Sequence, residues 1–223
     1  MLLEFMPKGG IKDREAFMEL LRIDTTEFNR VLKGKKIDTK KATDELVEDK
    51  YRKLKPFIKN SINDYQKSWD KINDNFFRLV RNKTGTNWKY KKYYCVVSAY
   101  HEGISSWGGK TIARRWSVNA DVQRKITAHE LVLSHFWMML SQNEISKNWN
   151  NNKKWRYSEI FSWCLLGLDQ DFRIFWPWIL EKDIFPENHN YPKLIPLQKK
   201  LKQLYSNCDN FVEFFQKAIK KGV

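Results

Sequence analysis

Two adjacent side chains, His129 and Glu130, are of the types found in metal-dependent hydrolases. An imidazole nitrogen is a common zinc ligand, and a neighbouring carboxylate can take a proton from a metal-bound water as that water attacks a carbonyl. On a helix, a second ligand would stand four residues later, because positions i and i+4 differ by only about 40° around the axis. That position is Leu133, which has no donor atom.

Two further donor residues lie near this pair in the sequence. His135 follows His129 by six positions. These positions differ by about 240° on a regular helix, so the two imidazoles point to different sides. Glu159 lies near the start of the apolar segment "SEIFSWCLLGL" and is placed to act as a ligand from a second helix. Alternatively, Glu159 is a helix N-terminal charge that is favourable against the helix dipole.

The elements that must position these residues follow from the hydrophobic pattern. Residues 92–100 ("KYYCVVSAY") and 110–118 ("KTIARRWSV") are rich in β-branched and aromatic residues and predict two strands. The glycine-containing residues 101–109 between them predict a loop. From Asn119 the helical period returns, and this helix carries His129.

The remaining pattern is mostly helical. In the first part of the chain it predicts a helix over 13–33, a charged linker over 34–50, and a helix with an apolar stripe from Ile58 to Leu79 that ends at Gly85. Further on it predicts an Asn-rich connector over 141–155 and two closing helices around Leu194–Leu204 and Phe211–Phe215. Together these elements predict an α+β fold, with a helical N-terminal segment (1–85) and a core with closing C-terminal helices (86–223).

Composition limits the class of protein and its partners. The 223 residues include 41 Lys and Arg against 26 Asp and Glu, a net charge of +15. This favours anionic partners such as nucleic acid or a lipid surface, although a solvated lysine-rich surface gives the same count. The three widely spaced cysteines form no disulfide framework, and the first ten residues lack the apolar run of a signal peptide. We therefore expect a cytoplasmic protein without a transmembrane segment.

The order of these segments resembles the zincin metallopeptidases, and among them the gluzincin-like group. The resemblance covers about residues 88 to 170 and rests on "YYCVVSAYHEGISSWGGKTIARRW", "ITAHELVLSH" and "WRYSEIFSWCLLGL". It implies a zincin-like core with a small twisted sheet and a zinc cofactor. It also implies His129 and Glu159 as metal ligands, Glu130 as the catalytic base and a peptide or protein as substrate.

The chain departs from this family at Leu133, where the second histidine ligand belongs. Three explanations follow. The protein has lost metal and hydrolysis, or the helix is distorted so that His135 becomes a ligand, or His101 or His189 completes the site from a loop. Two functions of other classes also remain open. One is a non-catalytic peptide-binding module on a zincin scaffold, and the other is nucleic-acid binding through stretches such as "WKYKKYY" and "NNNKKWRY".

Overall fold

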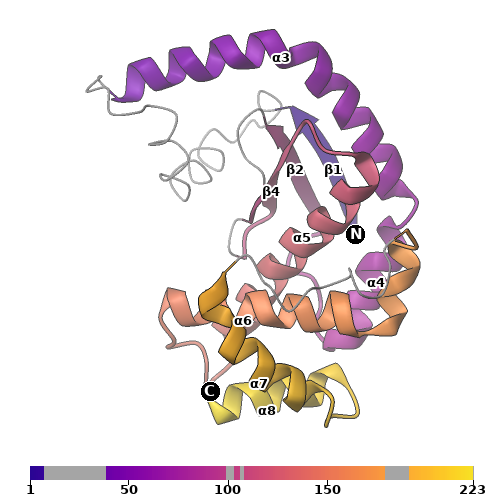
Figure 1. The fold of residues 1–223 in the computed structure, drawn as a ribbon, viewed down its shortest axis with the longest axis vertical. Coiled ribbons are helices and arrows are strands. Elements are labelled where there is room, and N and C mark those ends of the chain that lie inside the picture. The colour runs from indigo at the N-terminus through magenta and orange to yellow at the C-terminus, as the bar shows by residue number, and fades with distance from the viewer. Residues whose placement is uncertain (8–38, 99–102, 106–107, 179–190, 223) are drawn as a thin grey trace.

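The computed structural model describes residues 1–7, 39–98, 103–105, 108–178 and 191–222. The predicted helix over 13–33 and the histidines His101 and His189 lie outside these residues. The described chain is α+β and mostly helical, with one small sheet (Figure 1). No helix within these ranges is long and apolar enough to cross a membrane.

The sheet has four strands in the order β1-β2-β4-β3. The strands are β1 (Leu2–Pro7), β2 (Lys92–Ser98), β3 (Gly103–Ser105) and β4 (Thr111–Arg115). β1, β2 and β4 run parallel, and β3 is antiparallel to β4 with Ile104 opposite Ala113. The two predicted strands are confirmed. The first spans all the described residues of 92–100, and the second is shorter than the predicted 110–118. The prediction of a loop over 101–109 is wrong for 103–105, because those residues pair with β4.

The N-terminal segment is not wholly helical, since β1 pairs with β2 across a helical connection. Parallel neighbours need such a crossover, which α3 (Thr39–Asp70) and α4 (Asn73–Thr84) provide here. α3 contacts both β1 and α5 (Figure 1), so packing runs across residue 85. The division of the chain at that residue stays a prediction.

The apolar stripe from Ile58 to Leu79 is carried by two helices rather than one. The chain leaves the helix between Asp70 and Asn73. There the Asn73 amide oxygen accepts hydrogen bonds from Trp69 Nε1 (3.0 Å) and from the Leu3 backbone (3.3 Å). An Asn side chain that bonds outside the helix in this way competes with helical hydrogen bonding. α4 ends at Gly85 as predicted, because that residue is left-handed with φ 64°.

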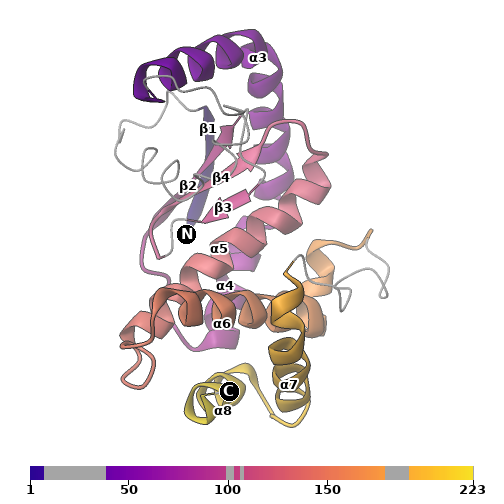
Figure 2. The same cartoon turned by 60° about the vertical axis from the view of Figure 1, so that its left-hand side comes forward.

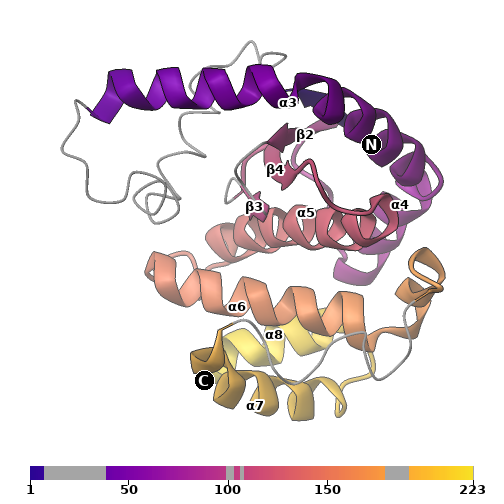
Figure 3. The same cartoon turned by 45° about the horizontal axis from the view of Figure 1, so that its top comes forward.

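Among the remaining helices, α5 packs against the sheet and the others follow beyond it. These helices are α5 (Ala120–Gln142), α6 (Asn151–Trp163), α7 (Ile195–Tyr205) and α8 (Phe211–Lys221). α5 lies between the sheet and α6 (Figure 3), and α7 and α8 lie beyond α6 (Figure 2). The two predicted closing helices are confirmed. A π-helical turn (Cys164–Leu168) and a 3-10 turn (Gln170–Phe175) follow α6.

Aromatic residues make up 15% of the sequence, and their rings fill much of the core. Phe76 is fully buried and contacts Trp69, Phe77, Phe172 and Phe175 at centroid distances of 5.2 to 6.2 Å, in edge-to-face geometry. These rings come from α3, α4 and the 3-10 turn. The same core therefore joins the first described helices to the segment that follows α6.

Candidate functional site

α5 is the element that carries the candidate chemistry, and its start is capped by Asn119. The Asn119 side chain accepts hydrogen bonds from the backbone of Asp121 (2.9 Å) and Val122 (3.4 Å). These bonds satisfy amide groups that have no partner within the helix. The helical start predicted at Asn119 is therefore confirmed.

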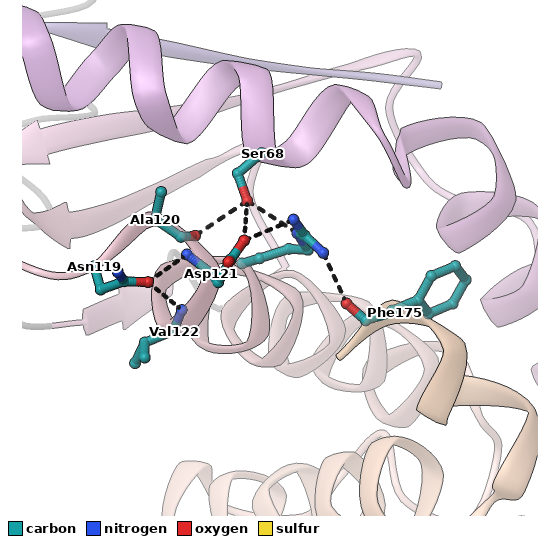
Figure 4. Close-up of polar contacts among 7 residues, drawn as sticks. Ser68, Asn119, Ala120, Asp121, Val122 and Phe175 are labelled. Carbon is teal, nitrogen blue, oxygen red and sulfur yellow. Dashed lines mark hydrogen bonds and ion pairs between the residues drawn. The ribbon is translucent and has the colours of Figure 1, made fainter. Parts of the chain in front are cut away.

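Arg124 attaches the first turn of α5 to two other elements. Its Nε donates to Ser68 Oγ of α3 (3.0 Å), Nη1 donates to the Phe175 carbonyl (3.0 Å), and Nη2 donates to Asp121 (2.8 Å). Figure 4 shows these acceptors converging on one point between α3, α5 and the turn after α6. The Trp178 ring lies 4.9 Å from the guanidinium carbon. Arg124 is 7% exposed. Its contacts therefore help to fix where α5 lies.

Further along α5, Ser134 holds the connection that leads into β4. Its hydroxyl accepts from the Gly108 amide (3.0 Å) and donates to the Gly109 carbonyl (2.9 Å). Gly108 has φ 88°, and a Cβ there would lie 3.3 Å from the Trp137 ring. Only glycine adopts this backbone at low cost. The start of β4 is thereby kept close to α5, and β3 is also in contact with α5.

The structure brings His129 and Glu159 together from α5 and α6. His129 Nε2 lies 3.3 Å from Glu159 Oε2. The second carboxylate oxygen of Glu159 accepts a hydrogen bond from Trp155 Nε1 (3.0 Å), and His129 Nδ1 lies 2.8 Å from Ser162 Oγ. The His129 side chain is 24% exposed and the Glu159 side chain 6%. Both groups are thus oriented by α6, and the imidazole remains accessible to solvent.

Ser162, His129 and Glu159 have the composition of a serine-hydrolase triad, but burial argues against that chemistry. Ser162 is fully buried. A nucleophile must reach the carbonyl carbon of its substrate, which a hydroxyl enclosed by protein cannot do. The Ser162 hydroxyl therefore serves to orient the imidazole of His129, as a partner of the second nitrogen does in many metal sites.

Glu130 faces the sheet, where it meets a buried arginine. Arg114 of β4 lies 3.8 Å from Glu130 through Nη1 and Oε1, and the two side chains are 3% and 9% exposed. In an active metallopeptidase the corresponding carboxylate accepts a proton from the metal-bound water. Here a guanidinium lies beside that carboxylate, so part of its negative charge is already compensated.

The site is a cluster of two acids and two bases, and their pKa values reflect this. Burial disfavours the charged imidazole, but the Glu159 carboxylate, with help from Glu130, outweighs burial and raises the pKa of His129. Burial also raises the pKa of Glu130, and the opposing effects of His129 and Arg114 only partly offset it. The geometry therefore favours a protonated imidazole beside Glu159.

His135 is not brought to this cluster. It is 2% exposed, its ring lies 4.5 Å from that of Trp88, and Nε2 lies 3.2 Å from Thr84 Oγ1. The Thr84 hydroxyl donates its proton to the Val80 carbonyl (2.8 Å). It therefore accepts a hydrogen bond from His135, whose neutral ring carries its proton on Nε2. The prediction of His135 as a metal ligand is not supported by this placement. The cause is that α5 stays regular, so residues six apart point to different sides.

Burial of His135 leads to a testable pH dependence. Burial lowers the pKa of His135 to about 3, whereas an unfolded chain titrates near its ordinary value of 6.5. Below about pH 6.5 the unfolded state therefore binds a proton that the folded state does not. We expect this proton uptake by the unfolded state to remove about 2 kcal/mol from the free energy of unfolding between about pH 7.5 and about pH 5. Urea unfolding of wild type and of His135→Leu at both pH values measures the loss, since the variant has no imidazole at this position. Parallel losses in the two proteins would contradict the assignment.

The residues present can be compared with what zinc requires. Two ligands on tetrahedral zinc, each about 2.1 Å from the metal, lie about 3.4 Å apart. His129 and Glu159 match this spacing. The next position on the same face of α5 is Leu133, a 3% exposed hydrocarbon side chain. Within the described ranges, no group of three His, Cys, Asp or Glu could hold a metal ion. The described residues therefore do not fit the three-ligand site that hydrolysis by zinc uses.

Three residues that shape this site were not predicted as site residues: Arg114, Trp155 and Ser162. Trp155 and Ser162 lie four residues before and three residues after Glu159, a spacing that puts all three on one face of a helix. That spacing was a usable signal. The signal for Arg114 was weaker, namely a charge within the otherwise apolar stretch "TIAR".

No known protein family, curated protein or solved structure matches this chain.

Proposed function

We propose that the protein is a zincin-related peptide-binding protein whose hydrolytic metal site is degenerate. The observation that carries this is Leu133, buried at the position of the missing ligand, next to a His129–Glu159 pair that keeps ligand spacing. The arrangement around it supports the zincin relationship. An antiparallel edge strand contacts the His129 helix, and a later helix supplies Glu159.

Loss of hydrolysis is supported by two independent features. Leucine cannot replace a nitrogen ligand, so zinc would retain only two of its protein ligands among the described residues. In addition, Arg114 lies 3.8 Å from Glu130, and this ion pair directs the carboxylate toward β4. A general base acts only when it reaches the proton that it takes, so a carboxylate held by a guanidinium is poorly placed for a metal-bound water. Both features remove chemistry while leaving the fold intact.

Peptide binding is supported by the edge of the sheet. β3 is the last strand in the order β1-β2-β4-β3, and no described strand pairs with its outer edge. Such an edge presents unpaired backbone groups, which an extended peptide can complete as an added strand. β3 also contacts α5, the helix of His129. A peptide added there would lie on the sheet edge that borders this helix.

The test uses casein, an unfolded polypeptide that reports both binding and cutting. With zinc added, we expect wild type to bind labelled casein without releasing fragments, and to hold less than one zinc per chain by elemental analysis. Hydrogen exchange of residues 103–105 should slow when casein binds, because an added strand protects amides at the edge. Zinc-dependent cutting that Glu130→Gln abolishes would overturn the loss of hydrolysis. Failure to bind casein would overturn peptide binding.

A further inference from the structure

A second surface, away from the His129–Glu159 pair, combines lysines with tyrosine rings. It lies where β2 and β4 begin, and we call it the Lys–Tyr patch: Lys89, Tyr90, Lys92, Tyr94 and Lys110. The Tyr94 amide donates to the Lys110 carbonyl (2.8 Å), which joins the two chain segments. β4 then runs from this patch to Arg114 at the opposite end, beside Glu130.

Each ring of the patch has an ammonium group close to it. Lys89 Nζ lies 5.1 Å from the centre of the Tyr90 ring, and Lys92 and Lys110 lie 5.2 and 5.7 Å from that of Tyr94. Lys89 and Lys110 are exposed, and Tyr90, Lys92 and Tyr94 are half-buried. The ring of Tyr90 is held in place by the buried Tyr93, which it meets edge-to-face at 5.7 Å.

The surroundings of the patch are strongly basic. Residues 75–120 contain nine Lys and Arg and one acidic residue, Glu102. Lys83 and Arg114 are among those that pair with carboxylates elsewhere in the fold. The sheet register places Glu4 of β1 opposite Tyr94. Within the described part of the chain, three ammonium groups therefore lie on the two tyrosine rings of the patch.

We infer that the Lys–Tyr patch binds single-stranded nucleic acid. Lysines attract phosphates, and displaced counterions make such binding depend on salt. A tyrosine ring can stack on any base, and that stacking is stronger than an exposed cation–π contact. A lysine that leaves its ring for a phosphate therefore frees a face for a base. A lipid surface would use the lysines but would leave the rings without a stacking partner, so the interleaved rings favour nucleic acid.

The first test compares two triple variants of the full chain by fluorescence anisotropy with a labelled oligonucleotide of about 12 thymidines. One variant carries Lys89→Gln, Lys92→Gln and Lys110→Gln. The matched control carries Lys199→Gln, Lys200→Gln and Lys220→Gln on the exposed faces of α7 and α8. Both variants lose the same charge. We expect the first to bind about 100-fold more weakly at 0.1 M salt, with a salt slope that is smaller by about 2, and the control to bind like wild type.

Tyr94→Leu separates stacking from charge. We expect it to weaken binding severalfold while leaving the salt slope unchanged, because it removes a ring and no cation. Vesicles containing about one-third phosphatidylserine test the lipid alternative. The inference is overturned if wild type does not bind the oligonucleotide, if both triple variants weaken equally, if Tyr94→Leu binds like wild type, or if vesicles are preferred over the oligonucleotide.

Discussion

Leu133→His is expected to convert the protein into a stoichiometric zinc binder. The new imidazole would stand one turn after His129 on the same face of α5, near Glu159 of α6, and so supply the missing corner of a three-ligand site. We expect zinc affinity to rise by at least about 100-fold over wild type. Removing a group that only hydrogen-bonds to a metal ligand already lowers affinity by about 10- to 100-fold, and a direct ligand should contribute more. Competition with a chromogenic chelator at near-neutral pH measures the change.

Two controls decide whether the gain comes from the intended geometry. Leu133→Ala removes the leucine without adding a ligand, and it should not gain zinc. Adding Glu159→Gln to Leu133→His should return affinity to near the wild-type value, because an amide oxygen is a poorer zinc ligand than a carboxylate. If Leu133→His binds no more zinc than Leu133→Ala, then His129 and Glu159 are not the remainder of a metal site, and the zincin relationship loses its main support.

The same variant also tests whether Arg114 prevents Glu130 from acting as the general base. Zinc bound in Leu133→His would lower the pKa of a bound water and polarise a carbonyl. Arg114 would still hold the carboxylate of Glu130, which should act as base, in an ion pair directed toward β4. We therefore expect Leu133→His to gain zinc while gaining little casein hydrolysis. Metal binding and activity would in that case have been lost through different residues.

Arg124→Met is expected to lower the free energy of unfolding by about 3 kcal/mol, because three hydrogen bonds worth about 1 kcal/mol each are lost and the Phe175 carbonyl loses this donor. Ser68 Oγ keeps its bonds to the Ala120 carbonyl and to Asp121 but loses the guanidinium donor (Figure 4). Methionine keeps most of the buried stem, so the loss reports polar contacts rather than a cavity. Urea unfolding measures it.

Arg78→Met is the matched control, since Arg78 is exposed and makes a single hydrogen bond to Asn75 on its own helix. It should change stability by less than about 0.5 kcal/mol. Arg124→Lys should fall between the two, because an ammonium cannot make the three divergent bonds of a guanidinium. Equal losses in Arg78→Met and Arg124→Met would contradict the role of Arg124 in holding α5.

The anchoring of α5 also bears on the candidate site. Arg124 lies little more than one turn before His129, and its bonds tie α5 to α3 and to the turn after α6. If these bonds set the spacing of His129 and Glu159, then Arg124→Met added to Leu133→His should weaken zinc binding as well as stability. Zinc affinity that survives the double change would show that packing between α5 and α6 alone maintains the spacing.

Local pattern in the sequence was sufficient for much of the helical framework. The start of α5 at Asn119, the end of α4 at Gly85 and the two closing helices were predictable. Caps and apolar periodicity depend on residues within one or two turns of each other. The same helical geometry also predicted two features of the site. His135 points to a different side of the helix from His129, and Leu133 occupies the position where a second ligand would stand.

Contacts between distant residues were decided only by the tertiary structure. Three such contacts were not predictable. β1 pairs with β2, residues 103–105 pair with β4, and Arg114 lies beside Glu130. Strand pairing and buried ion pairs depend on which surfaces are brought together, and a period of 2 or 3.6 carries no information about the partner. The sequence therefore determined which residues could do chemistry, whereas the packing of β4, α5 and α6 determined what surrounds them.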